Sequence, residues 1–460
     1  MIQEYEGFLL TKEKYLQKMN LFTFKKIIYQ GKFYKELKTT ADDLSSDLYV
    51  VGGCLRDFII GHPENIRDID FASDQALKLA RKFSKKIAAP FILLDEEEET
   101  GRVVIKSGKN KELSMDFSQI RGKTIFQDIY KRDFTINAMA IAFNDFFLDD
   151  ELKLIDPLEG IRDIGNRSIK TVSDDSFTDD PLRMLRAFRF ATTLNFTISL
   201  HTFELINLYK EKIIEVSGER IEAELFKMFD SDHSYRYLRQ MDEAGLLEVI
   251  IPEIKKTVLW VHKFSVYKNL EKIISEEYKN IFPHCFDKVS DYIKGPYRKA
   301  MLKFALLLYG QSNSAENICR RLKMSNYKID TIAKLIKFYP DFLKISYNKI
   351  SVLKFFRKTG DDGIGILLIS LAEGLMSEEK LRNILKIYLD EIKSMWENPR
   401  LISGDDLSGI FGLIPGPDFK KILQQIEEKQ LEGIIKTRDE ALRHIEENYV
   451  RCEAYKMHEH

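Results

Sequence analysis

The stretch LYVVGGCLRDFIIGHPENIRDIDFAS, residues 48–73, decides the fold of the N-terminal part of the chain. Its run LYVV predicts a buried strand that enters a Gly-Gly turn at Gly52–Gly53, and Cys54–Ile60 continues as a helix. Arg67–Ala72 predicts a second strand, on which Asp68 and Asp70 alternate by two and therefore point to one face. This order of strand, turn, helix and acidic strand indicates an α/β domain that carries a polar site.

The flanking sequence extends this pattern into an α/β domain followed by helices. Ala76–Ala88 predicts an amphipathic helix, and we expect three further strands at Phe91–Asp95, Arg102–Ser107 and Glu112–Ser118. Residues 1–45 look helical and end at a polar break, Thr39–Ser46. Beyond about Ser176 nearly every segment has helical spacing. The expected fold class is therefore α+β, an α/β domain followed by a long all-helical region.

The first polar constellation predicts a phosphate and metal site. Backbone N–H groups at Gly52–Gly53 can approach a phosphate chain closely, and Arg56, one turn into the helix, can add a charge-assisted contact. The carboxylates of Asp68 and Asp70, with phosphate oxygens nearby, suit Mg²⁺. Asp116 is a third acidic residue on a later strand. Each piece is weak alone, because a Gly-Gly pair is most often a simple turn and an Asp pair most often a surface or loop feature.

The second constellation is KRDFTINAMA, residues 131–140. Arg132 could clamp a phosphate, and Asp133 could accept a hydrogen bond from a ribose hydroxyl. Asn137 follows Asp133 by four residues, so both lie on one face if the segment is helical. A capped helix that enters the core is an equally good reading of the same residues.

The third constellation is TDDPLRMLRAFRF, residues 178–190. Thr178 or Asp179 before Pro181 predicts a helix start. Asp180 and Arg183 form a neighbouring acceptor–donor pair that could read the hydrogen-bonding edge of a base. Such a pair would accept C and A, which carry an exocyclic amine where G and U present a carbonyl. Arg186 and Arg189 follow on adjoining stripes that a triphosphate could reach.

These stretches resemble, in order, the five motifs of class II tRNA nucleotidyltransferases. The motifs are carried by VVGGCLRD with RDIDF, KRDFTINAMA, IDPLEGIRDI, DDPLRMLRAFRF and GERIEAEL (Gly218–Leu225). The family includes CCA-adding, CC-adding and A-adding enzymes and bacterial poly(A) polymerases. The resemblance covers residues 46–230, and a stretch from Leu401 to Glu447 is similar to the family's C-terminal tail motif.

The resemblance implies a polymerase β-like nucleotidyltransferase α/β head followed by an all-helical neck, body and tail. The expected parts are a helical N-terminal extension (1–45), a catalytic head (46–172), a neck with nucleotide-selecting helices (173–240), a basic tRNA-binding body (241–360) and a tRNA-binding tail (361–460).

The resemblance also implies roles for individual residues. Asp68 and Asp70 match the catalytic pair that binds the metal, with Mg²⁺ as the implied cofactor, and Asp116 is the third catalytic acid. Asp180 and Arg183 match a protein template that selects C and A, and Gly218-Glu219-Arg220 matches the brace behind it. The implied nucleotide-binding residues are Gly52, Gly53, Arg56, Arg132, Asp133, Asn137, Asp180, Arg183, Arg186 and Arg189.

The spacing between two motifs bears on the product. A-adding members of the family carry a long flexible segment between the third acidic strand and the second constellation, whereas here 16 residues, Phe117–Arg132, separate Asp116 from Asp133. We therefore expect an enzyme that adds CC from CTP to the 3′ end of tRNA and releases pyrophosphate. A complete CCA-adding enzyme, a bacterial poly(A) polymerase and a non-catalytic RNA-binding protein of the same fold are the alternatives.

The charge distribution bears on the partner. The chain has 71 Lys+Arg and 72 Asp+Glu, a net charge of −1 that argues against a nucleic-acid binder. Residues 251–360, however, hold 22 basic and 9 acidic residues, a net of +13, which suits the acceptor end and elbow of tRNA. A solvated helical surface is the simpler reading of such a stretch.

The remaining composition concerns the cellular setting. Four cysteines without metal-like spacing indicate a reducing compartment. The N-terminus lacks a secretory pattern, and the most apolar stretch, Gly363–Met376, is too short to span a bilayer. We expect a cytoplasmic protein that is monomeric, uses CTP and in the alternatives ATP, and has no membrane partner.

Overall fold

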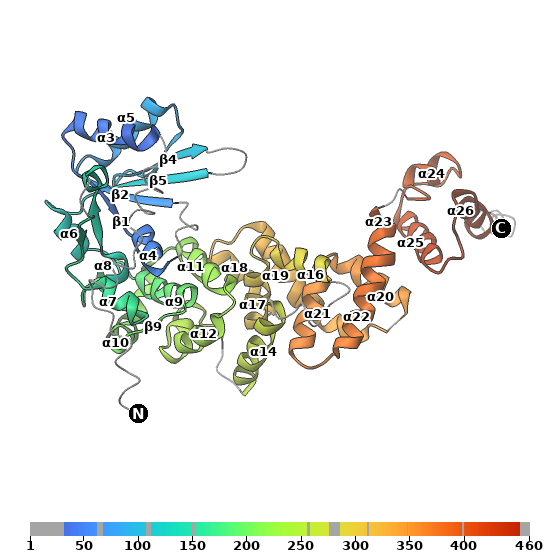
Figure 1. The fold of residues 1–460 in the computed structure, drawn as a ribbon. Helices are drawn as coiled ribbons and strands as arrows, with labels where there is room; N and C mark the ends of the chain where they lie inside the picture. The colour runs from blue at the N-terminus through green and yellow to red at the C-terminus, as the bar shows by residue number, and fades with distance from the viewer. Residues whose placement is uncertain are drawn as a thin grey trace. The chain divides into compact units, whose positions relative to one another are not determined.

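The computed structural model describes residues 32–61, 68–106, 112–148, 152–254, 258–275, 286–310, 312–346, 348–397 and 400–450 (Figure 1). These residues form two compact units. The first contains the described residues up to Glu224 together with Gln240–Ile250, and the second contains Leu225–Arg239 and the described residues from Ile251 onward. Most of the N-terminal extension expected at residues 1–45 lies outside the described residues, which begin with helix α3 (Lys32–Leu44).

Seven strands of the described first unit form one mixed sheet, in the order β3-β4-β5-β2-β1-β6-β7. Only β2 and β5 pair in parallel; the other neighbours are antiparallel. The strands are β1 (Leu48–Val51), β2 (Asp68–Ser73), β3 (Phe91–Asp95), β4 (Thr100–Lys106), β5 (Glu112–Gln119), β6 (Ala140–Ala142) and β7 (Leu154–Ile155).

One face of this sheet is apolar and covered by helices. Helix α5 (Ala76–Ile87) packs there with α3, and Figure 1 shows the two helices together beside β2, β4 and β5. The ring centroid of Phe83 on α5 lies 6.2 Å from that of Phe117, which stacks on Phe71 at 5.1 Å. Because side chains alternate along a strand, Asp70 and Asp116 point to the opposite face.

Short elements and helices complete the first unit. Strands β8 (Ser168–Ile169) and β9 (Thr197–Ile198) pair in parallel. The other elements are α4 (Gly53–Ile60), α6 (Ile125–Tyr130), η2 (Thr135–Asn137), η3 (Phe143–Phe147), α7 (Gly160–Gly165), α8 (Ser176–Asp179), α9 (Arg183–Leu194), α10 (Leu200–Tyr209), η4 (Lys210–Glu215) and α13 (Leu246–Ile250). The boundary between the units falls within α11 (Gly218–Asp230) and α12 (Ser234–Glu243).

The described part of the second unit is helical throughout. It contains α14 (Val258–Ile274), α16 (Phe286–Lys294), α17 (Arg298–Leu308), α18 (Ser312–Arg321), α19 (Asn326–Phe338), η5 (Tyr339–Lys344), α20 (Lys349–Thr359), α21 (Asp362–Ala372), α22 (Glu378–Lys386), η6 (Ile387–Ile392), α23 (Lys393–Glu397), α24 (Gly404–Gly409), α25 (Pro417–Leu431), α26 (Arg438–Ile445) and η7 (Glu446–Val450). None of the helices in the described ranges has the length and the apolar character that a membrane span requires.

The structure confirms the α+β class and the predicted strands, and it corrects three local predictions. Helix α3 runs through the predicted break at Thr39 because its apolar face, with Leu37 and Ala41 buried, packs against α5. The hydroxyls of Thr39 and Thr40 are satisfied within the helix by donating to carbonyls one turn back, at 2.8 Å and 2.6 Å. The segment after Asp133 is a single 3-10 turn, η2, rather than an α-helix. Helix α9 begins at Arg183, after the separate turn of α8, instead of at Thr178 or Asp179.

Candidate active site

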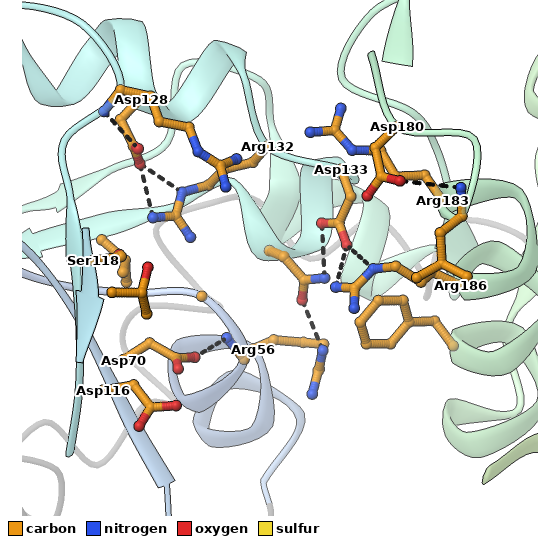
Figure 2. A pocket seen from close by; sticks show the side chains of 18 of the residues that line it. Arg56, Asp70, Asp116, Ser118, Asp128, Arg132, Asp133, Asp180, Arg183 and Arg186 are labelled. Atoms are coloured by element: carbon orange, nitrogen blue, oxygen red, sulfur yellow. Dashed lines mark hydrogen bonds and ion pairs between the residues drawn. The ribbon is translucent and has the colours of Figure 1, made fainter. Parts of the chain in front are cut away.

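A cavity of about 500 Å³ lies in the first unit, at the polar face of the sheet (Figure 2). It is large enough for a small ligand. Its walls come from β1, β2 and β5, from the α6–η2 segment, and from the start of α9. Eleven of the thirteen predicted site residues line it: Gly52, Gly53, Arg56, Asp70, Asp116, Arg132, Asp133, Asn137, Asp180, Arg183 and Arg186.

The Gly-Gly turn is built around the carboxylate of Asp70. The backbone N–H of Gly53 donates to Asp70 Oδ2 at 3.3 Å. Gly52 has φ of 76°, and a Cβ there would lie 2.8 Å from the same oxygen. Glycine is therefore required at position 52 by both backbone and space. Burial and the neighbouring Asp116 carboxylate raise the pKa of Asp70, although Arg132 and the Gly53 N–H oppose this shift.

Asp116 lies beside Asp70 and is held by an arginine. The parallel register of β2 and β5 pairs Asp70 with Asp116. Strand β4 lies on the edge of β5 opposite to β2. From β4, Arg102 donates to both carboxylate oxygens of Asp116, from Nε at 2.6 Å and from Nη2 at 2.8 Å. These hydrogen bonds raise the pKa of Arg102. One acid of the cavity is thus neutralised within the sheet.

Asp68 lies on the same face of β2 but is exposed and does not line the cavity. Asp68 and Asp70 supply carboxylate oxygens of the kind that a hard divalent cation prefers. Among the described residues, no three His, Cys, Asp or Glu side chains converge to hold a metal by themselves. Two carboxylates leave the remaining coordination positions of such an ion to phosphate and water oxygens.

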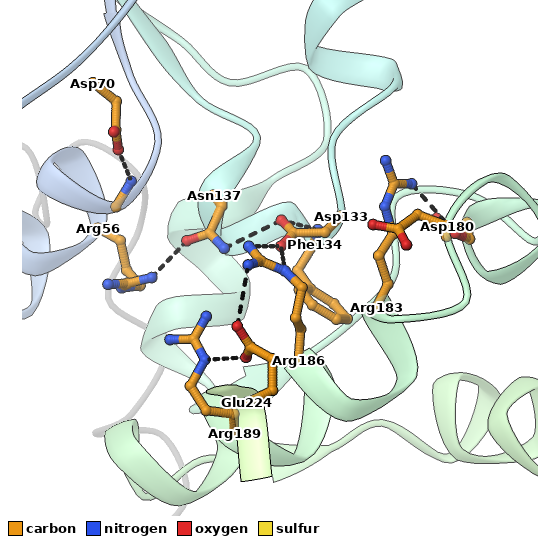
Figure 3. Close-up of polar contacts among 12 residues, drawn as sticks. Arg56, Asp70, Asp133, Phe134, Asn137, Asp180, Arg183, Arg186, Arg189 and Glu224 are labelled. Carbon is orange, nitrogen blue, oxygen red and sulfur yellow. Dashed lines mark hydrogen bonds and ion pairs between the residues drawn. The ribbon is translucent and has the colours of Figure 1, made fainter. Parts of the chain in front are cut away.

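A chain of polar contacts joins the first constellation to α9 (Figure 3). Arg56 Nη1 donates to Asn137 Oδ1 at 2.7 Å, and Asn137 Nδ2 donates to Asp133 Oδ1 at 3.2 Å. Asp133 Oδ2 accepts from Arg186 Nε and Nη2 at 3.0 Å and 2.6 Å. Burial opposes ionisation of Asp133, but Arg186 outweighs it and lowers the pKa to about 2. The predicted relation between Asp133 and Asn137 is present without a helix.

The predicted selecting pair stands at the start of α9. Asp180 Oδ1 accepts from the backbone N–H of Leu182 at 3.2 Å, and Oδ2 accepts from Arg220 at 3.0 Å. Arg183 donates to the carbonyl of Lys131 at 2.8 Å and to that of Ser176 at 3.4 Å. Burial lowers the pKa of Arg183. Both side chains are thus fixed by contacts within the first unit while they face the cavity.

Arg189 does not take the position expected of it. Its guanidinium lies 3.6 Å from the ring centroid of Phe190, and its Nε donates to Glu224 at 2.8 Å. It does not line the cavity. Glu224 lies on α11 and is also 3.8 Å from Arg186. Arg189 therefore takes part in the contact between α9 and α11. The N-terminal half of α11 thus contacts α9 at Glu224 and Asp180 of the selecting pair at Arg220.

Sequence reasoning missed several residues around the cavity. Asp128 binds the guanidinium of Arg132 at 2.7 Å and the backbone N–H of Arg121 at 3.2 Å. The i,i+4 spacing of Asp128 and Arg132 could have revealed that pair. Glu224 lies in the motif GERIEAEL, where the sequence does not distinguish it from the neighbouring acid Glu222. Arg102 had no signal, because its partner depends on the register of two strands.

Comparisons with known proteins show which families the chain resembles. The chain matches the Poly A polymerase head domain over residues 48–170, the probable RNA and SrmB-binding site of polymerase A over 195–257, and tRNA nucleotidyltransferase domain 2 over 297–445.

Individual relatives match over most of their length. The chain is 30% identical over 410 residues to a CC-adding tRNA nucleotidyltransferase of Geobacter sulfurreducens, covering 86% of this chain and 91% of the relative. It is 27% identical to the CC-adding enzyme of a Synechocystis species, covering 86% and 92%. A structure of a CCA-adding enzyme with CTP superposes with a TM-score of 0.68 at 25% identity, covering 90% and 93%. The chain belongs to the family of tRNA nucleotidyltransferases and poly(A) polymerases.

Proposed function

We propose that the chain is a template-independent RNA nucleotidyltransferase that adds CMP residues from CTP to the 3′ end of tRNA. The product would be the CC of the CCA end, made in synthesis or repair with release of pyrophosphate. The observation that carries this proposal is that one cavity combines the acidic strands with the selecting pair. Asp70 and Asp116 line one wall, and Asp180 and Arg183 line another.

In this proposal the wall with Asp70 and Asp116 carries the chemistry, and the wall with Asp180 and Arg183 recognises the base. Transfer of a nucleotidyl group relies on positioning and charge stabilisation more than on covalent help from the protein. Arg56 and Arg132 line the cavity near Asp70 and present guanidinium groups suited to phosphate oxygens. A triphosphate between them would leave its base directed toward α9.

Selection of C and A over G and U follows from hydrogen-bond polarity. The Asp180 carboxylate accepts from an exocyclic amine, and Arg183 donates to ring or carbonyl acceptors. G and U present a carbonyl where C and A carry the amine, so the carboxylate disfavours them. Arg220 and the Leu182 N–H hold Asp180, which restricts the carboxylate to one orientation.

Mg²⁺ is the proposed cofactor, with Asp68 and Asp70 as its protein ligands. Bound there, it would supply Lewis-acid activation and stabilise negative charge on phosphate oxygens. The protein's own part is to orient these ligands. The Gly53 N–H fixes Asp70, and alternation along β2 places Asp68 on the same face.

The restriction to CC rests on the segment between Asp116 and Asp133. The structure describes all of this segment. It is short and consists of the end of β5, a turn and helix α6, which side-chain hydrogen bonds hold in place. Thr124 caps α6 by accepting from Gln127 N, and Asp128 ties the helix to both Arg121 and Arg132. Relatives named CC-adding favour the same product.

The helical second unit is the proposed tRNA-binding region. Several of its basic residues are compensated by acids outside residues 251–360: Lys299 pairs with Asp232, and Arg357 with Glu427. The excess of +13 is therefore smaller at the surface than the count implies. Lys323 and Lys337 remain exposed. A cytoplasmic location and a monomeric state stay predictions from the sequence.

The test is CMP transfer to tRNA that lacks its CCA end, with labelled CTP and Mg²⁺. We expect incorporation by the wild-type chain, and tRNA binding without turnover by Asp70→Ala. If Asp70→Ala retained full incorporation, the proposed catalytic role would be wrong. If neither chain incorporated CMP while both bound tRNA, the non-catalytic RNA-binding alternative would replace the proposal.

A further inference from the structure

Three neighbouring strands place one basic and two acidic side chains in a row. The antiparallel register of β4 and β5 pairs Arg102 with Asp116, and the parallel register of β5 and β2 pairs Asp116 with Asp70. Residues in register on adjacent strands point to the same face. The row therefore runs Arg102–Asp116–Asp70 across the polar face of the sheet, with Asp68 two residues along β2.

Arg102 and Asp116 form a bidentate ion pair. Nε and Nη2 each donate to a different carboxylate oxygen, at 2.6 Å and 2.8 Å, in the planar arrangement that makes such pairs strong. The side chains are 35% and 20% exposed, so water screens the pair only in part. Both oxygens of Asp116 are thus engaged by an internal cation.

A divalent cation at Asp68 and Asp70 would meet this arrangement. Its charge would attract the Asp116 carboxylate and repel the Arg102 guanidinium, because Asp116 lies between Arg102 and Asp70 in the row. The cation and Arg102 therefore compete for the same carboxylate.

We infer that Arg102 is a built-in counter-ion of the acidic cluster, which holds Asp116 and weakens divalent-cation binding at Asp68 and Asp70. Arg102 is a positioning residue: it acts through Asp116 and does not line the cavity. The inference rests on the proposed metal site. Its consequence is that Asp116 stays neutralised without metal, and that metal enters most readily together with a nucleotide, whose phosphates supply additional ligands.

The test measures Mn²⁺ binding to the full chain, without nucleotide or RNA, by titration calorimetry and by the electron paramagnetic resonance of free Mn²⁺. We expect Arg102→Gln to bind Mn²⁺ about tenfold more tightly than the wild type, because the Asp116 carboxylate is released from its internal cation and its charge then attracts the metal. Lys106→Gln removes a charge from the same face of β4, where Lys106 is exposed, and should leave the affinity unchanged. Arg102→Lys keeps the charge and should stay near the wild-type affinity. Circular dichroism checks that each variant folds.

A second comparison asks whether Arg102 acts through Asp116. In an Asp116→Asn background, Arg102→Gln should gain less than threefold, because the carboxylate in dispute is gone. Equal or weaker Mn²⁺ binding by a folded Arg102→Gln variant would overturn the inference, and so would a tenfold gain that persists in the Asp116→Asn background. Loss of binding in Asp68→Asn and Asp70→Asn confirms the metal site independently. Binding that survives both substitutions would overturn the metal site and the inference together.

Discussion

The carboxylate of Asp133 accepts two hydrogen bonds from the guanidinium of Arg186, and this pair joins the η2 turn to helix α9. Asp133 also accepts from Asn137 Nδ2 and from the Phe134 N–H at 2.8 Å. The buried carboxylate thus holds the segment that carries Arg132 against the helix that carries Arg183. We regard this pair as the link between the phosphate side and the base-selecting side of the cavity.

Asp133→Asn should lower the stability of the first unit by about 2–3 kcal/mol, because Arg186 loses its charged partner. The pKa of Asp133 is about 2 in the folded chain and about 3.9 in an unfolded one. The stabilisation is therefore fully present above pH 4 and is lost only as the pH falls toward 2. Urea unfolding at pH 7.5 and pH 5 should give the same difference between variant and wild type. A difference that vanishes at pH 5 would contradict the assigned pair.

Asp70→Asn should stabilise the fold while it abolishes nucleotide transfer. The raised pKa means that ionised Asp70 is unfavourable in the folded chain at neutral pH, owing to its burial and to the Asp116 carboxylate. The amide oxygen can still accept from the Gly53 N–H. We expect a rise in thermal midpoint of a few degrees, with CMP transfer lost. A lower midpoint would show that the Asp70 charge supports the fold.

Gly52→Ala should impair transfer far more than its cost to stability explains. The new Cβ would lie 2.8 Å from Asp70 Oδ2 and displace that carboxylate. Gly61→Ala is the matched control: its φ is also positive, at 101°, but nothing lies within 4 Å of the added Cβ. Both variants should lose about 1 kcal/mol through backbone strain, and only Gly52→Ala should lose kcat. Equal activities would mean that the Gly52–Asp70 approach is unimportant.

Arg220→Ala should relax base selection without unfolding the chain. The side chain of Arg220 is 53% exposed, and its Nη2 donates to Asp180 Oδ2. A freed carboxylate discriminates less well, so the preference for CTP over UTP should fall about tenfold. Lys212→Ala removes an exposed charge that pairs with Glu215 and should leave the preference unchanged. Competition between CTP and UTP in the transfer assay measures both, and an undiminished preference in Arg220→Ala would argue against the brace.

Much of the site was predictable because strand alternation and motif order carry it. Asp68 and Asp70 share a face because side chains alternate along a strand. The Gly-Gly turn is predictable because a strand there runs directly into a helix. The helix start at Arg183 was missed because Asp180 makes its own turn, accepting from the Leu182 N–H, which ends α8 before α9 begins. Side-chain competition of this kind is invisible in a helical periodicity.

Long-range pairing accounts for the other differences. Arg189 looked like a phosphate contact from its spacing along α9, but Glu224 on α11 binds it away from the cavity. Arg102 was not singled out, although it contacts a predicted catalytic acid, because only the register of β4 against β5 brings the two together. Residues 251–360 do carry a net charge of +13. Acids outside this stretch, such as Asp232 and Glu427, pair with some of its basic residues and lower the excess positive charge at the surface.

The most direct measurement of the central claim is the 3′-end sequence of a tRNA product. A tRNA that lacks its CCA end is incubated with the purified chain, Mg²⁺, CTP and ATP, and the ends are sequenced. Our account predicts that the products stop after the second C. Products that carry the terminal A would contradict CC-only addition, and long A tails would identify a poly(A) polymerase.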